Sequence, residues 1–189
     1  LGGASTTGKS GGMGDLRFVF KGIGPMDGWE IRYGVDLGIS PSKGKDATAT
    51  ITGNRNSGGH SLSPFVGVLY PVADAWDIGA KLSYNYLMER TVEDPSSTPS
   101  VDTKTTGGST FSFTPFVEWD FGDGLLGAFV DLSSTGSSTQ TTPTTTTSLS
   151  GYSTTSFGLQ GRYDFNEMFT GLLQFTSSSS TGKPVSASV

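Results

Sequence analysis

The stretch from Trp29 to Ser40 reads WEIRYGVDLGIS, and every odd position in it is apolar while every even position is polar or glycine. Such an alternation of period two predicts a β-strand with one apolar and one polar face. In a soluble protein the apolar face would turn into a core. In a membrane barrel it would meet lipid and leave Glu30, Arg32 and Asp36 inside. The fold class therefore depends on which face meets water.

Similar alternating runs along the chain predict eight strands and no long helix, because glycine is scattered too densely for helices. The expected strands lie at about 14–23, 28–40, 61–71, 76–89, 110–121, 125–133, 152–164 and 168–176. Short connections alternate strictly with long polar ones, which lie at 41–60, 90–109 and 134–151. This predicts an antiparallel up-and-down sheet with tight turns at one end and long loops at the other. That asymmetry is typical of an outer-membrane barrel.

Composition narrows the choice of protein class. No run of about 18 apolar residues exists, so a transmembrane helix is excluded, whereas a barrel tolerates a polar residue at every second position. The chain has no cysteine, which excludes disulfides and thiolate chemistry. Its formal net charge of −5, without a basic cluster, argues against a nucleic-acid partner.

The apolar face contains aromatic residues that all fall within a few positions of a short turn. We expect them to form a girdle at one membrane interface, where amphipathic rings collect. The girdle residues are Trp29, Tyr70, Trp76, Trp119, Tyr163 and Phe169.

The opposite face contains charges of both signs, which we expect to form a charge network in the lumen. Its residues are Arg17, Lys21, Glu30, Arg32, Asp36, Asp77, Lys81, Glu118, Asp131 and Arg162. Eight strands enclose an interior just wide enough for side chains to fill. We therefore expect Arg32 to pair with carboxylates from at least two other strands, Glu118 first among them.

The segment PFVGVLYPVADAWDIGAKLSYNYL at 64–87 is a strand, a tight turn, a Trp and a long second strand. It resembles the hairpins of small bacterial outer-membrane barrels of the OmpA-like and opacity type. The resemblance implies an integral outer-membrane location and a polar lumen, with lipid and lipopolysaccharide as surroundings. It transfers no catalytic, cofactor or metal residue. SPFVGVLYPVADAW at 63–76 is echoed by TPFVEWDFGDGL at 114–125, which indicates a repeated hairpin.

Two features depart from those families. The first connection is short, which places both ends on the long-loop side, and the chain lacks an aromatic C-terminus. Either residues 1–189 form a single barrel domain, with strands at about 14–176 and polar ends at 1–13 and 177–189, or the chain is a segment of a larger barrel. We favour closure at eight strands, an established and even number.

Three functions remain open. The first is a non-catalytic barrel with a structural and surface-contact role, in which recognition falls to the long loops, and the uncharged run at 133–150 is a mobile loop. The second is a small pore for ions or solutes, favoured by the space that inward glycines would leave. These are Gly34, Gly38, Gly67, Gly79 and Gly127. The third, disfavoured, is a lipid hydrolase that uses His60 with Ser61 or Ser63. A soluble ligand-binding barrel is disfavoured by the direction of the charges.

Overall fold

The computed structural model describes residues 10–11, 14–45, 53–54, 57–94, 99–166, 169–182 and 186–188. These residues form strands, turns and irregular segments, so the predicted all-β class is confirmed. None of the described segments is a helix long and apolar enough to cross a membrane.

The eight long strands predicted from the alternation are present in chain order and pair antiparallel with their sequence neighbours. They are β2 (Leu16–Met26), β3 (Trp29–Ile39), β6 (Gly59–Ala73), β7 (Trp76–Asp94), β9 (Thr110–Asp120), β10 (Gly124–Thr135), β13 (Tyr152–Asn166) and β14 (Phe169–Thr181). Tight turns join β2 to β3, β6 to β7 and β9 to β10, as predicted, whereas the turn predicted between β13 and β14 lies outside the described residues. Gly28 and Gly122 have positive φ angles of 74° and 90° in two of these turns, a conformation that glycine adopts at no steric cost.

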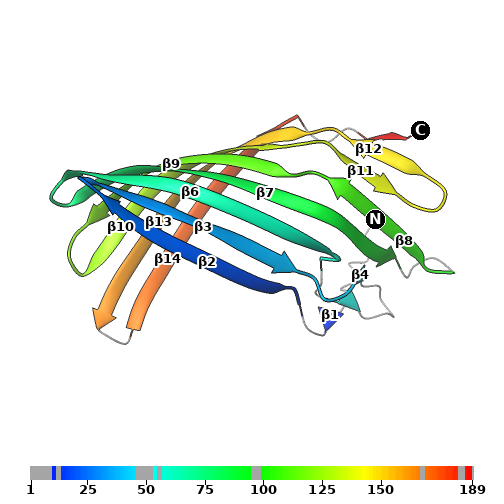
Figure 1. Ribbon diagram of the computed structural model, residues 1–189, viewed down its shortest axis with the longest axis horizontal. Coiled ribbons are helices and arrows are strands. Elements are labelled where there is room, and N and C mark those ends of the chain that lie inside the picture. Colours follow the sequence, from blue (N-terminus) through cyan, green and yellow to red (C-terminus); the bar gives the residue numbers. More distant parts are fainter. Residues whose placement is uncertain are drawn as a thin grey trace, which may run out of the picture.

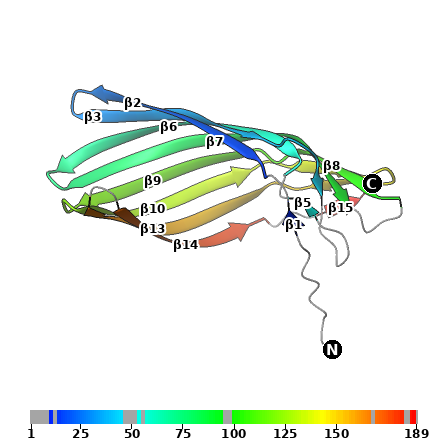
Figure 2. The same cartoon turned by 90° about the horizontal axis from the view of Figure 1, so that it is seen from below.

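The sheet is strongly curved and forms an open trough (Figure 1). In Figure 2 the two strands at its margins, β2 and β14, lie at opposite edges of the curved sheet. Among the described residues β2 pairs with β3 alone, and β14 pairs with β13 alone. The predicted closure into an eight-stranded barrel is therefore not present in this structure. Seven ladders join neighbours along the chain, and the eighth, between its first and last long strands, is missing.

Shorter strands extend the sheet beyond the expected eight. They are β4 (Gly44–Lys45), β8 (Val101–Gly107), β11 (Ser138–Thr141), β12 (Thr146–Leu149) and β15 (Ser186–Ser188). They come from segments predicted to be loops or, for β15, from the predicted polar end at 177–189. β7 continues to Asp94 and pairs with β8, which pairs with β11, then β12, then β15. A separate parallel pair joins β1 (Ser10–Gly11) to β5 (Gly53–Asn54).

The mobile loop predicted at 133–150 is thus wrong for the residues that form β11 and β12. The threonines of this run are β-branched and favour extended backbone, and polarity alone did not indicate that. Across the turn between the two strands, the backbone N–H of Thr142 donates to the carbonyl oxygen of Thr145 at 2.8 Å, and the hydroxyl groups of the same two residues share a second hydrogen bond. We call β8, β11, β12, β15 and residues 90–94 the polar extension.

The curved sheet has no apolar core on its concave side. Among the described residues Leu69 is the single buried hydrophobic side chain, at 8% exposure. Large apolar side chains instead cover the convex face of the long strands and are exposed there. A soluble sheet protein of this length would bury its apolar face. Which solvent the exposed apolar face of this sheet meets is therefore the main question about its function.

Candidate functional site: a charged concave face and an aromatic outer band

Residues predicted to form the girdle lie in a row of aromatic rings on the convex face at the tight-turn end. The contacting ring pairs have centroid separations of 4.8 Å for Trp29–Tyr70, 5.9 Å for Trp76–Trp119, 5.4 Å for Trp119–Phe121, 6.4 Å for Phe121–Tyr163 and 4.9 Å for Tyr163–Phe165. Separations of 4.5–7 Å are those of favourable aromatic pairs. Five of the six predicted girdle residues are therefore in this row. The sixth, Phe169, begins β14, where only the backbone is described.

The convex face continues from this row as an apolar band. On β7 it runs from Trp76 through Ile78 and Leu82 to Tyr84 and Tyr86, all between 42% and 47% exposed. Ten residues of extended strand span roughly 33 Å, or about 25 Å along the normal to a bilayer when the strand tilts by about 40°. That is the height of the apolar band of an outer-membrane barrel.

All ten charges predicted for the lumen lie on the opposite, concave face. The strand registers establish this, because partners across a ladder share a face. Arg17 is opposite Gly38, Asp77 opposite Glu118, and Arg162 opposite Leu125, so the set is continuous from β2 to β13.

Ion pairs on this face join near neighbours. Arg32 pairs with Glu30 two positions away, Arg162 pairs with Asp164 at 3.1 Å, and Arg17 pairs with Asp36 on the adjacent strand. The expected pairing of Arg32 with Glu118 is not among the ion pairs of the described residues. Residues two apart on a strand project to the same side, so a carboxylate at that distance reaches the guanidinium before one across the trough.

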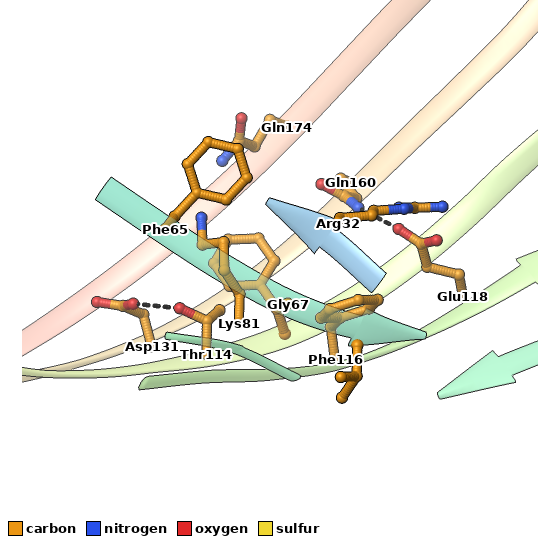
Figure 3. Close-up of a pocket in the computed structure, with 12 residues that line it drawn as sticks. Arg32, Phe65, Gly67, Lys81, Thr114, Phe116, Glu118, Asp131, Gln160 and Gln174 are labelled. Atoms are coloured by element: carbon orange, nitrogen blue, oxygen red, sulfur yellow. Dashed lines mark hydrogen bonds between the residues drawn. The ribbon is translucent and has the colours of Figure 1, made fainter. Parts of the chain in front are cut away.

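Glu118 is the most buried charge on the concave face, at 9% exposure. Its Oε1 accepts a hydrogen bond of 3.1 Å from Nε2 of Gln160 on β13. Figure 3 shows this bond in a cavity of about 420 Å³, together with the 2.6 Å bond from Thr114 Oγ1 to Asp131. The cavity is amphipathic, because three phenylalanine rings line it beside the charges.

Those rings, Phe65, Phe116 and Phe129, are features that the sequence reasoning missed. Each covers a glycine on a neighbouring strand: Phe65 covers Gly34, Phe116 covers Gly79, and Phe129 covers Gly158. The Pro-Phe-Val echo has its explanation here, since Phe65 and Phe116 each place a ring over a glycine of the preceding strand. Parity from Val117 and Trp119 could have placed Phe116 on the concave face.

The same contacts overturn the idea that inward glycines leave open space. Gly34 and Gly79 lie under aromatic rings, and Gly38 lies under the hydroxyl of Ser61. A β-carbon at Gly127 would contact Gln160 at 3.0 Å, and one at Gly67 would contact the backbone of Ala80 at 3.2 Å. Neighbouring atoms therefore occupy the space above each of the five.

His60 lies at the loop end of the trough, in the wall of a cavity of about 530 Å³. Its Nδ1 accepts a hydrogen bond of 3.2 Å from the backbone N–H of Ser40, and Ser63 donates to Asn85 instead. The described contacts join neither Ser61 nor Ser63 to His60, so the geometry gives the hydrolase hypothesis no nucleophile–base pair. Within the described segments no cluster of three or more His, Cys, Asp or Glu side chains could hold a metal ion.

Two charged side chains, Asp15 and Lys43, join segments at the loop end of the sheet, outside the apolar band. Partial burial raises the pKa of Asp15, but hydrogen bonds from Ser57 and Ser40 and the nearby His60 outweigh it, so the pKa lies below its ordinary value. The hydrogen bond to Asp102 raises the pKa of Lys43 above its ordinary value. Lys43–Asp102 and Lys104–Glu89, at 3.5 Å, attach neighbouring segments to β8.

No protein-family model matches the chain, and no curated protein matches it.

Proposed function

We propose that this chain is an integral β-barrel of the bacterial outer membrane, in which the eight long strands close around a charged interior. The observation that supports it best is the direction of the apolar face. The convex side of the sheet has an aromatic row at one end and an apolar band beyond it, whereas charges of both signs fill the concave side. Lipid is the solvent that suits this arrangement.

The proposed role is structural and non-catalytic, with contact to other surfaces through the polar extension. Inside, charged groups are satisfied by neighbours, as Arg32 is by Glu30 and Glu118 by Gln160. Outside the band, β8, β11 and β12 present backbone and hydroxyl groups on an ordered platform. A platform of this kind suits recognition of a surface partner, because β15 at its margin pairs with β12 alone among the described residues, and an exposed strand edge can accept another strand.

A small pore is the second candidate. The observation in its favour is a hollow of about 770 Å³ along β2, β3, β6 and β7, which Lys21 and Lys81 help to line. Side chains over the inward glycines count against it. Planar-bilayer recording separates the two roles: we expect no stable stepwise conductance from the purified protein, and such steps would make the pore the better proposal.

Tryptophan fluorescence tests the membrane assignment. All three tryptophans belong to the aromatic row, so in reconstituted vesicles a quencher attached near the lipid headgroups should reduce their emission more than iodide does. Strong iodide quenching of all three would contradict the assignment.

Replacing 137–150 by a short turn tests the division of roles. The barrel should keep its resistance to unfolding in detergent, because the removed strands contact the extension and not the apolar band. Loss of folding would mean that the extension is part of the barrel wall.

A further inference from the structure

The curved sheet has two unpaired edges in the structure, one on β2 and one on β14. Along each edge, a row of backbone N–H and C=O groups lacks a strand partner among the described residues. Edge side chains are also among the most exposed apolar groups: Leu172 at 80%, Leu173 at 78%, Ile23 at 64% and Phe175 at 61%. Neither lipid nor water suits such an edge, since lipid offers no hydrogen bonds and an exposed edge in water recruits other strands.

We propose that the two edges are each other's partner, paired antiparallel with Phe20 opposite Leu173. This rests on the proposed barrel and adds the partner and the register of each edge. Seven antiparallel ladders separate β2 from β14, so the two strands run in opposite directions and can form an eighth ladder of the same kind.

The curvature of the sheet supports direct pairing. Arg32 of β3 and Leu172 and Gln174 of β14 line one cavity of about 470 Å³. The last long strand therefore faces the beginning of the sheet across the hollow. An eight-stranded wall encloses a narrow interior with room for side chains and little else, so strands that line one cavity across the hollow suit closure at eight.

The register follows from the seven ladders. Successive partners connect Pro25 to Thr176 through Glu30, Leu69, Gly79, Phe116, Phe129 and Gly158. When a barrel closes, the path across all its ladders returns to the first strand displaced by a number of residues, which is the total stagger. Strands that rise about 3.3 Å per residue and lie about 4.8 Å apart need a total stagger of roughly eight to ten residues for a tilt of about 35–40°. A stagger of eight places Arg17 opposite Thr176. A larger stagger would move the partner of Thr176 beyond Leu16, where β2 begins.

The side chains on both faces suit this register. On the convex face Phe20 lies opposite Leu173 and Phe18 opposite Phe175, which makes two apolar cross-strand pairs. On the concave face Leu172 lies opposite Lys21, between Val19 and Ile23. These three are apolar residues at the two edges of the concave face, and each is without a covering strand on one side among the described residues. Closure removes them from water together, which explains why they occur at the edges.

Engineered disulfides test the proposal, and the chain has no cysteine of its own to interfere. Leu173→Cys is combined in turn with Phe20→Cys, Phe18→Cys, Gly22→Cys and Lys21→Cys, and the folded protein in vesicles is treated with a mild oxidant. Direct antiparallel partners have Cα atoms about 4.5–5.5 Å apart, within the span of a disulfide, whereas diagonal neighbours lie about 7–8 Å apart. We expect a fast intramolecular crosslink with Phe20→Cys, slower ones with Phe18→Cys and Gly22→Cys, and the least with Lys21→Cys, which faces the other side.

Three results would overturn the proposal: no intramolecular crosslink in any pair, crosslinks between two chains in place of one, or a maximum at Phe18→Cys or Gly22→Cys. Insertion is measured separately, by co-flotation of the same samples with vesicles. A crosslink without flotation would reject the membrane proposal and keep the seam. Flotation without a crosslink would do the reverse.

Discussion

Gly158→Ala is the substitution for which the structure gives the sharpest expectation of a stability cost. A methyl group at this position on β13 would overlap three atoms of the Phe129 ring, and no backbone atom is among its nearest contacts. The ring must therefore rotate away from the strand that it covers. Overpacking of this kind typically costs about 1–3 kcal/mol in the free energy of unfolding.

The control is Gly24→Ala on β2, where the nearest atoms would be 4.0 Å from the added methyl group. That variant should change stability by no more than about 0.5 kcal/mol. Both are measured by urea titration of the protein in vesicles, followed by tryptophan emission.

The reasoning is checked by adding Phe129→Leu, which shortens the side chain that the methyl group meets. The double variant should be more stable than the sum of the two single costs predicts, with a coupling of roughly 0.5–3 kcal/mol. Additive costs would refute the contact between Phe129 and Gly158.

Three further predictions concern the concave face and the loop end. Gln160→Leu removes the hydrogen bond to the buried Glu118 and should lower the free energy of unfolding by about 1–3 kcal/mol in the same titration. Gln174→Leu in the same cavity should cost less, and equal costs would mean that the bond contributes nothing. Arg32→Ala should cost only about 0.2–1 kcal/mol, because its side chain is 45% exposed and its partner Glu30 is 33% exposed; a loss above about 3 kcal/mol would indicate a dry lumen. Since folding lowers the pKa of Asp15, the stability that its carboxylate contributes is present above the pKa of the unfolded chain and is lost as the pH falls through the pKa of the folded protein. Proteolysis near Ser57 should therefore increase in that acidic range in the wild-type protein and not in the Asp15→Asn variant. An equal increase in the two proteins would reject the role of Asp15.

The alternation along the chain was enough to predict the long strands, their tight turns and the two faces. Parity assigns each side chain to a face, and the ladders preserve parity from strand to strand. That is why the ten charges share one face of the sheet and the aromatic row shares the other. That the charges form a lumen network and the rings a membrane girdle stays a prediction.

Ion-pair partners could not be predicted in this way. Parity specifies the face of Arg32 but not which of several carboxylates it reaches, and Glu30 on its own strand is the nearer one. The rings of Phe65 and Phe116 were missed because an inward face was assumed to be polar. In this sheet an aromatic residue opposite a glycine fills the space that the glycine leaves.

The sequence predicts loops and a polar end where the polar extension lies, because its serines and threonines indicate polarity more clearly than strand pairing. Their pairing depends on neighbours distant in sequence, as β8 pairs with both β7 and β11. The closure predicted from the sequence is not present among the strands that the structure describes. Closure is a property of the whole sheet, since the offset between strands accumulates over seven ladders and no local pattern contains it.

The central claim, that the convex face meets lipid, is tested most directly by placing the same charge on two neighbouring residues. Leu82 projects from the convex face in the middle of the apolar band, and Ser83 projects from the concave face. Leu82→Arg should lower the free energy of unfolding in vesicles by roughly 2–4 kcal/mol, because it puts a cation against the hydrocarbon, whereas Ser83→Arg should cost less than about 1 kcal/mol. Equal costs, or a greater cost at Ser83, would contradict the account.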